Sequence, residues 1–177
     1  MKTVGITALV PPEIIYGCGK KALDINNAVP FTTHYPRSKL CAWTAVWRDL
    51  LVERRMKVDS LIVVAGGDCH NALVDGQKVE LSGIDTHYFF YPFEEDQEFL
   101  ETQLLKLSDF LGGKTETGAA KKIEKLKEMG LCLEQARIDG KVRASDLFPL
   151  LVSFSDLGGN VNAFEAKLIT LSKRGAV

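Results

Sequence analysis

The stretch that decides the fold is LIVVAGGDCH, at residues 61–70. The expected strand extends back through Ser60 and Asp59 to Val58, and its apolar run, 61–65, is followed by two glycines, an aspartate, a cysteine and a histidine. A continuous, β-branched apolar run of this length is typical of a parallel strand that is covered on both faces of its sheet. We therefore expect a strand over 58–65. Its carboxyl end would deliver the thiol of Cys69 to the edge where open α/β sheets bind ligands.

Strand-like and helix-like segments alternate on both sides of this run. Helices are expected within 13–22, over 41–56 and over 94–111, and Gly19 should end the first of them. Further strands are expected within 4–10, 23–27 and 87–92. Strands that alternate with helices predict a parallel sheet with right-handed crossovers. The fold class is therefore α/β, a Rossmann-like parallel sheet flanked by helices.

Beyond residue 112 no strand is expected. One helix should run from about Thr117 to Asp139, a short second helix should be interrupted near Pro149, and a third should start at Asn160 or Asn162. The residues of the third helix expected to face inward are Phe164, Leu168, Ile169 and Leu171. The chain is thus predicted to consist of an α/β domain, 1–112, and a small C-terminal helical subdomain, 113–177.

Composition excludes several classes of function. The 177 residues are 46% hydrophobic and 25% charged, with a net charge of −1, whereas a nucleic-acid-binding chain should carry a basic excess. No apolar run approaches the roughly 20 residues that span a bilayer, and the N-terminus lacks the long apolar core of a signal peptide. We expect a cytoplasmic protein with neither a nucleic-acid nor a membrane partner.

Cys41 stands at the expected start of the 41–56 helix. The N-terminal backbone amides and the helix dipole would lower the pKa of its thiol and stabilise a thiolate, and Arg37 and Lys39 add positive charge. The alternative is that Cys41 is a small buried hydrophobic residue.

Cys69 and His70 follow the glycines of the central strand, which allow the backbone to approach a bulky ligand closely. His70 is interpreted as a metal ligand, a donor to the sulfur of a ligand, or a histidine with a structural role in the loop. Cys18 and Cys132 stand among apolar residues and are expected to pack. Thiolates are soft ligands that favour iron–sulfur clusters and zinc.

Three segments together resemble a known family. PPEIIYGCG, at residues 11–19, is similar to the pattern P-x-E-[IL]-[IL]-x-A-x-G; Cys41 precedes a helix rich in aromatic residues; and Cys69 follows a Val-rich strand. The order resembles the 2-hydroxyacyl-CoA dehydratase and benzoyl-CoA reductase family, as do the proline-ended strand and long helix that follow. This resemblance extends over nearly the whole chain.

The resemblance implies that Cys41 and Cys69 are thiolate ligands of a [4Fe-4S] cluster. It further implies that an ATP-hydrolysing iron–sulfur activator supplies one high-energy electron, which the cluster passes to the thioester of a 2-hydroxyacyl-CoA so that the hydroxyl group leaves. The chain would then be a component of a lyase or a reductase. Glu13 and Tyr16 of the first helix would lie on the substrate side of the site.

The resemblance also implies a third thiolate, which the family carries in a second α/β domain. A second α/β subunit, a homodimer, or an additional ligand such as His70 or Cys18 would complete the site. Two other hypotheses remain open. One is a non-catalytic α/β module that uses its cysteines for packing and binds a partner or a small acyl ligand. The other is a zinc site formed by Cys41, Cys69 and His70.

Overall fold

The structure, a computed structural model, describes residues 1–28, 41–66, 70–113 and 116–175. Within these residues the chain forms a parallel sheet in the order β2-β1-β3-β4. The strands are β1 (Thr3–Ile6), β2 (Lys21–Asp24), β3 (Ser60–Val64) and β4 (Asp85–Phe89). The predicted α/β fold with a parallel, helix-flanked sheet is confirmed.

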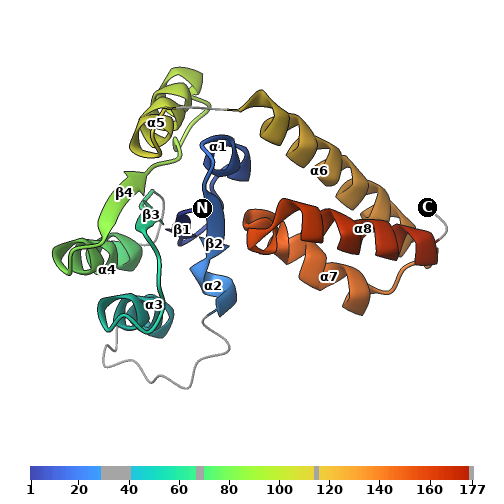
Figure 1. The fold of residues 1–177 in the computed structure, drawn as a ribbon, viewed down its shortest axis with the longest axis horizontal. Helices are drawn as coiled ribbons and strands as arrows, with labels where there is room; N and C mark the ends of the chain where they lie inside the picture. Colours follow the sequence, from blue (N-terminus) through green and yellow to red (C-terminus); the bar gives the residue numbers. More distant parts are fainter. Residues whose placement is uncertain (29–40, 67–69, 114–115, 176–177) are drawn as a thin grey trace.

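Helices cover both faces of the sheet (Figure 1). One face carries α3 and α4, and the other carries α1 and α5 together with the C-terminal helices α6, α7 and α8. The bounds are α1 Pro12–Gly17, α2 Ile25–Ala28, α3 Ala42–Val52, α4 His70–Leu81, α5 Gln97–Phe110, α6 Thr117–Ile138, α7 Ala144–Val152 and α8 Val161–Gly175, with short 3-10 helices η2 (Ser153–Ser155) and η3 (Leu157–Gly159).

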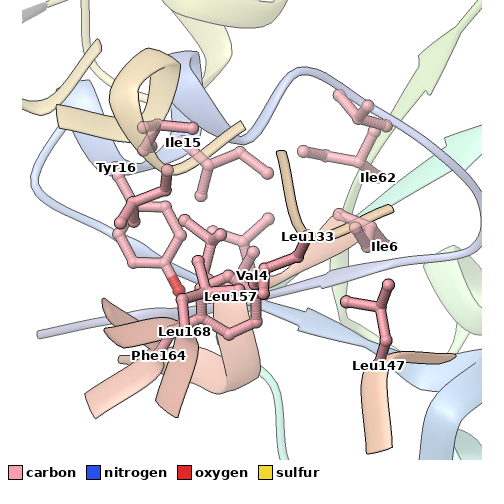
Figure 2. Close-up of a cluster of buried hydrophobic side chains, with 14 of the residues drawn as sticks. Val4, Ile6, Ile15, Tyr16, Ile62, Leu133, Leu147, Leu157, Phe164 and Leu168 are labelled. Carbon is pink, nitrogen blue, oxygen red and sulfur yellow. The ribbon is translucent and has the colours of Figure 1, made fainter. Parts of the chain in front are cut away.

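The strands alternate their side chains between two hydrophobic clusters, as the pleat of a strand requires. On β3, Ile62 joins the cluster beneath α1 and the C-terminal helices, while Leu61 and Val63 join the cluster beneath α3 and α4. Figure 2 shows the first cluster, in which Leu168 of α8 lies among side chains of the sheet and of α1. The C-terminal helices therefore share a hydrophobic core with the sheet.

The segment around η3 covers the outer edge strand, β2. The side chain of Asp156 accepts a hydrogen bond from the backbone N–H of Asp24 at 2.9 Å, and the hydroxyl of Tyr16 donates to the backbone carbonyl of Asp156 at 2.6 Å. Exposed edge strands invite pairing with other chains, so this cover protects β2.

Several expectations are corrected. The strand predicted over 23–27 lies earlier, at Lys21–Asp24, and α2 follows it. Pro149 lies inside α7 rather than interrupting it. Helix α4, over His70–Leu81, was not predicted at all.

Among the expectations for the C-terminal helices, one is confirmed and two are corrected. The side chain of Asn160 accepts a hydrogen bond from the backbone N–H of Ala163 at 3.0 Å, which confirms Asn160 as the start of α8. Ile169 is 40% exposed and does not face inward, and Cys132 is exposed on α6 rather than packed in the core.

None of the described helices combines the length and the apolar composition that crossing a membrane requires.

Candidate functional site

The strand order places a switch point between β1 and β3. From β1 the chain passes by α1 to β2 on one side, and it later enters β3 on the other side of β1. In sheets of this kind ligands bind outside the carboxyl ends of the strands at such a point. Thr7, which follows β1, ties the two strand ends together there: its N–H donates to the carbonyl of Ile62 at 3.2 Å, and its hydroxyl accepts from the N–H of Val64 at 3.0 Å.

Cys41 is the N-cap residue of α3, with extended backbone angles of φ −144° and ψ 111°. The predicted helix start at this cysteine is confirmed. The backbone N–H of Thr44 is the largest influence that lowers the pKa of the Cys41 thiol below its usual value, and burial opposes it. The Thr44 hydroxyl and the N–H of Trp43 lower it further, and the charge of Asp75 opposes. A half-buried thiol at a helix N-terminus is suited to act as a thiolate ligand.

A buried polar cluster holds the start of α3 against α4. The carboxylate of Asp75, on α4, accepts hydrogen bonds from the Thr44 hydroxyl at 2.7 Å and from the Arg48 guanidinium at 2.8 Å. The Asp75 residue is only 6% exposed. This cluster therefore holds the start of α3, which bears Cys41, beside α4, which begins at His70.

Asn26, in α2, connects the ends of two strands to α3. Its side-chain amide donates to the carbonyl of Thr7, and its side-chain oxygen accepts from the indole N–H of Trp43. The backbone N–H of Asn26 donates to the carboxylate of Asp24, the last residue of β2, at 3.0 Å. The first turn of α3 is thereby fixed to the carboxyl edge of the sheet.

The structure brings some of the sequence-predicted residues together and separates others. His70 is the first residue of α4 and is exposed at the same edge as Cys41, while Cys69 lies outside the described residues. Cys18 caps the far end of α1, three residues before β2 begins, and therefore lies at the amino edge of the sheet. Cys18 and Cys41 are thus not brought together.

The two α1 residues proposed for the substrate side bind the C-terminal helices. Tyr16 is buried, its hydroxyl donates to the carbonyl of Asp156, and burial, followed by the charge of Asp156, raises its pKa to about 12. Glu13 forms an ion pair with Lys127 of α6 through Oε1, while its Oε2 is buried and has no hydrogen-bond partner among the described residues. The hydroxyl of Tyr16 is therefore engaged away from the switch point.

The donor chemistry at Cys41 fits one thiolate ligand of an iron–sulfur cluster or of zinc. Within the part of the chain that the structure describes, no three His, Cys, Asp or Glu side chains form a group that could hold a metal ion. Further ligands would have to come from Cys69, from His70 or from another chain.

Three residues that fix this edge were not identified from the sequence: Asn26, Thr44 and Asp75. Asn26 lies within the strand expected over 23–27, and its partner Trp43 is 17 positions away. Thr44 and Asp75 are 31 positions apart. Asp75 could have been identified only as a carboxylate on the apolar face of a helix. Because α4 was not predicted, this signal was missed.

Comparison of the sequence with protein-family models finds no match, and comparison with curated proteins finds none either. Function is therefore inferred from the residues at the carboxyl edge of the sheet and from their geometry.

Proposed function

We propose that this chain is a subunit or half-module that resembles the 2-hydroxyacyl-CoA dehydratases and benzoyl-CoA reductases. It would hold part of a [4Fe-4S] site, with Cys41 and Cys69 as thiolate ligands. When bound, the cluster would supply single electrons to an acyl-CoA thioester, at the expense of ATP hydrolysed by an iron–sulfur activator. The chain would accordingly be a component of a lyase or a reductase.

The observation that carries the proposal is the place of Cys41. It caps α3 at the carboxyl edge of a parallel sheet, and the hydrogen bond from Thr44 to Asp75 holds that helix start beside α4, which begins at His70, the residue after Cys69 in the sequence. Ligand sites of open α/β sheets lie at this edge. A helix N-terminus also favours the thiolate that a cluster iron requires.

The residues around Cys41 would serve to orient it. The N–H of Thr44 stabilises the thiolate, while Asn26, through Trp43, and Asp75, through Thr44, hold the first turn of α3 from two sides. Ligands held in this way are preorganised, so little freedom is lost when a metal group binds.

The ligand set requires a partner. A second α/β subunit or a second copy of this chain would contribute the remaining thiolate. His70 supports this arrangement because it is exposed at the same edge, where it is available as an additional ligand or as a donor to a sulfur. Cys18 is left out of the proposed site because it lies at the opposite edge.

Metal and sulfide analysis of the anaerobically purified chain tests the proposal. We expect iron and acid-labile sulfide in equal amounts, either as purified or after reconstitution with ferrous iron and sulfide beside the proteins encoded next to it. Zinc without sulfide would instead indicate a site formed by Cys41, Cys69 and His70. Protein that stays free of metal under both conditions would overturn the proposal in favour of an α/β module with structural cysteines.

A further inference from the structure

A cavity of about 490 Å³ lies between α6 and the segment that α7 and η2 form. Figure 1 shows α6 along the periphery of the molecule, beside α7 and α8. Leu151 of α7 and Phe154 of η2 line the cavity from one side. The residues of α6 that line it from the other side are Lys127, Gly130, Leu131 and Glu134.

One wall of the cavity is aromatic and is held in place. The ring of Phe154 lies directly against α6 at Gly130, where an added Cβ would be 2.8 Å from two of the ring carbons. The same ring makes an edge-to-face contact with Phe164 of α8, with the ring centres 4.8 Å apart. The cavity is therefore formed before anything occupies it, and a preformed site lowers the entropic cost of association.

Exposed apolar side chains continue the cavity into a larger surface. Leu131 is 72% exposed on the α6 side. On α7, Phe148 stands three residues before Leu151 and four before Val152, so these side chains lie on neighbouring parts of one face. Phe148 and Val152 are 66% and 42% exposed. A continuous apolar surface of this kind around a cavity indicates a protein interface.

The α6 side of the cavity is complementary to itself. Its residues are spaced i, i+3, i+4 and i+7, which is the set of side chains that one helix presents where a second helix crosses it. A second α6 that packs there antiparallel, on a two-fold axis midway between Gly130 and Leu131, exchanges the first residue of the set with the last. Lys127 of each copy then faces Glu134 of the other, and Leu131 of each copy faces the cavity beside Gly130 of the other.

The charges on α6 favour this antiparallel arrangement. Lys127 is paired within the chain with Glu13, and Glu134 is paired with Arg137 at 2.6 Å. An ammonium group has three donors and a carboxylate accepts at about four sites, so both groups can bind across the interface and keep these partners. The next pair outward, Glu124 and Arg137, is also of opposite charge. A parallel arrangement would instead set each charge against its own copy.

We propose that this chain forms a two-fold symmetric dimer in which two α6 helices pack antiparallel and Leu131 of each copy fills the cavity of the other. The inference goes beyond the proposed function and does not depend on it. The surface belongs to the helices on one face of the sheet, whereas Cys41 stands at the start of α3, on the opposite face.

Sedimentation velocity of the full chain over a range of concentrations tests the inference. We expect a dimer of the wild type at micromolar concentrations. Leu131→Asp should raise the Kd of the dimer by about 100-fold or more, because it would bury an unpaired carboxylate in an apolar cavity. Leu105→Asp is the matched control and should leave the Kd unchanged, since Leu105 is 67% exposed on α5 and does not line the cavity. A wild type that stays monomeric up to about 100 µM, or a dimer that survives Leu131→Asp, would overturn the inference.

A charge exchange tests the antiparallel arrangement itself. Lys127→Glu and Glu134→Lys each replace two attractions across the interface by two repulsions, so each should raise the Kd about ten-fold. The double variant restores opposite charges across the interface and should return to within about three-fold of the wild-type Kd. The within-chain pairs that these variants lose are partly exposed and contribute little to folding, which circular dichroism checks. A double variant that dimerises as weakly as the single variants would contradict the proposed dimer.

Discussion

Tyr16 shows at the scale of one residue how the sheet is joined to the C-terminal helices. It lies on α1, and its hydroxyl reaches across the core to the carbonyl of Asp156, 140 positions later in the chain. The sequence suggested a substrate-side role for Tyr16, whereas the structure assigns its hydroxyl to an internal hydrogen bond. The pKa of about 12 results from burial and from the charge of Asp156.

Tyr16→Phe should lower the free energy of unfolding by about 1–2 kcal/mol at pH 8, because the Asp156 carbonyl loses its donor. The raised pKa means that the folded chain holds the phenol proton above pH 10, where the unfolded chain releases it. The contribution of the Tyr16 hydroxyl to the free energy of unfolding is therefore fully present below about pH 10, and it is lost as the pH rises toward 12. Urea unfolding at pH 8 and pH 11 should show a smaller difference between wild type and variant at pH 11. A difference that does not change with pH would contradict this assignment.

Asp75 is the central residue of the cluster that holds α3 against α4. Asp75→Asn should cost about 2 kcal/mol of unfolding free energy, because the buried Arg48 guanidinium loses a charged partner. Lys78→Gln is the control: its ion pair with Asp75 spans 3.3 Å, but the Lys78 side chain is 53% exposed. Such pairs are worth less than about 1 kcal/mol. Both losses of unfolding free energy are measured by urea denaturation. Equal losses in Asp75→Asn and Lys78→Gln would show that the stability contributed by the cluster does not depend on its burial.

At the scale of elements, the composition of helix α4 explains why its sequence pattern did not predict a helix. Its buried residues are Ala72, Asp75, Gly76 and Val79, whereas Leu81 is 87% exposed. A buried face that contains a charge and a glycine has no apolar periodicity of the kind that predicts a helix. Only the packing of α4 on β3 and against α3 determines its inner face, and a single sequence does not reveal that packing.

Elements with a strong local signal were predictable. The run at 58–65 became β3, and the periodic spacing after Cys41 became α3. The strand expected over 87–92 lies at Asp85–Phe89 because pairing with β3 extends back to Asp85 opposite Ser60. At the site, the start of a helix at Cys41 was predictable. The contacts that fix it were not, since they join side chains 17 and 31 positions apart.

Gly76 determines how closely α4 lies on the sheet. A Cβ at this position would be 2.8 Å from a methyl carbon of Val63 and 3.3 Å from the ring of Tyr88. Gly76→Ala should therefore lower the unfolding free energy by about 1–2 kcal/mol, although alanine favours a helix by about 1 kcal/mol. Gly118→Ala is the control: nothing lies within 4 Å of a Cβ there. It should be neutral or stabilise by up to about 1 kcal/mol. Stabilisation by both substitutions, measured in urea, would refute the close contact.

At the scale of the whole molecule, one hydrophobic cluster joins the sheet to α6, α7 and α8. Leu168, on α8, is fully buried in that cluster together with Val4 and Ile62 of the sheet. The sequence predicted a small C-terminal helical subdomain for 113–177. Because this subdomain shares a hydrophobic core with the sheet, we expect the two regions to unfold together.

Leu168→Ala should lower the unfolding free energy by about 3 kcal/mol, the usual cost of a cavity left by a buried leucine. Two probes should follow one transition in urea: far-UV circular dichroism, which reports on all helices, and tryptophan fluorescence, which reports on Trp43 and Trp47 of α3. The shared core predicts that both midpoints move together in the variant. A fall in helical signal at a lower urea concentration than the fluorescence change would show an independent helical subdomain.

The central claim is that Cys41 and Cys69 hold an iron–sulfur cluster at the carboxyl edge of the sheet. The most direct measurement is electron paramagnetic resonance of the reduced chain, reconstituted anaerobically with ferrous iron and sulfide beside the proteins encoded next to it, for wild type, Cys41→Ala, Cys69→Ala and Cys132→Ala. Cys132 is exposed on α6 and serves as the matched control. We predict the signal of a reduced [4Fe-4S] cluster in wild type and in Cys132→Ala, and its loss in the other two variants. An undiminished signal in Cys41→Ala and Cys69→Ala, or no signal in wild type, would contradict the claim.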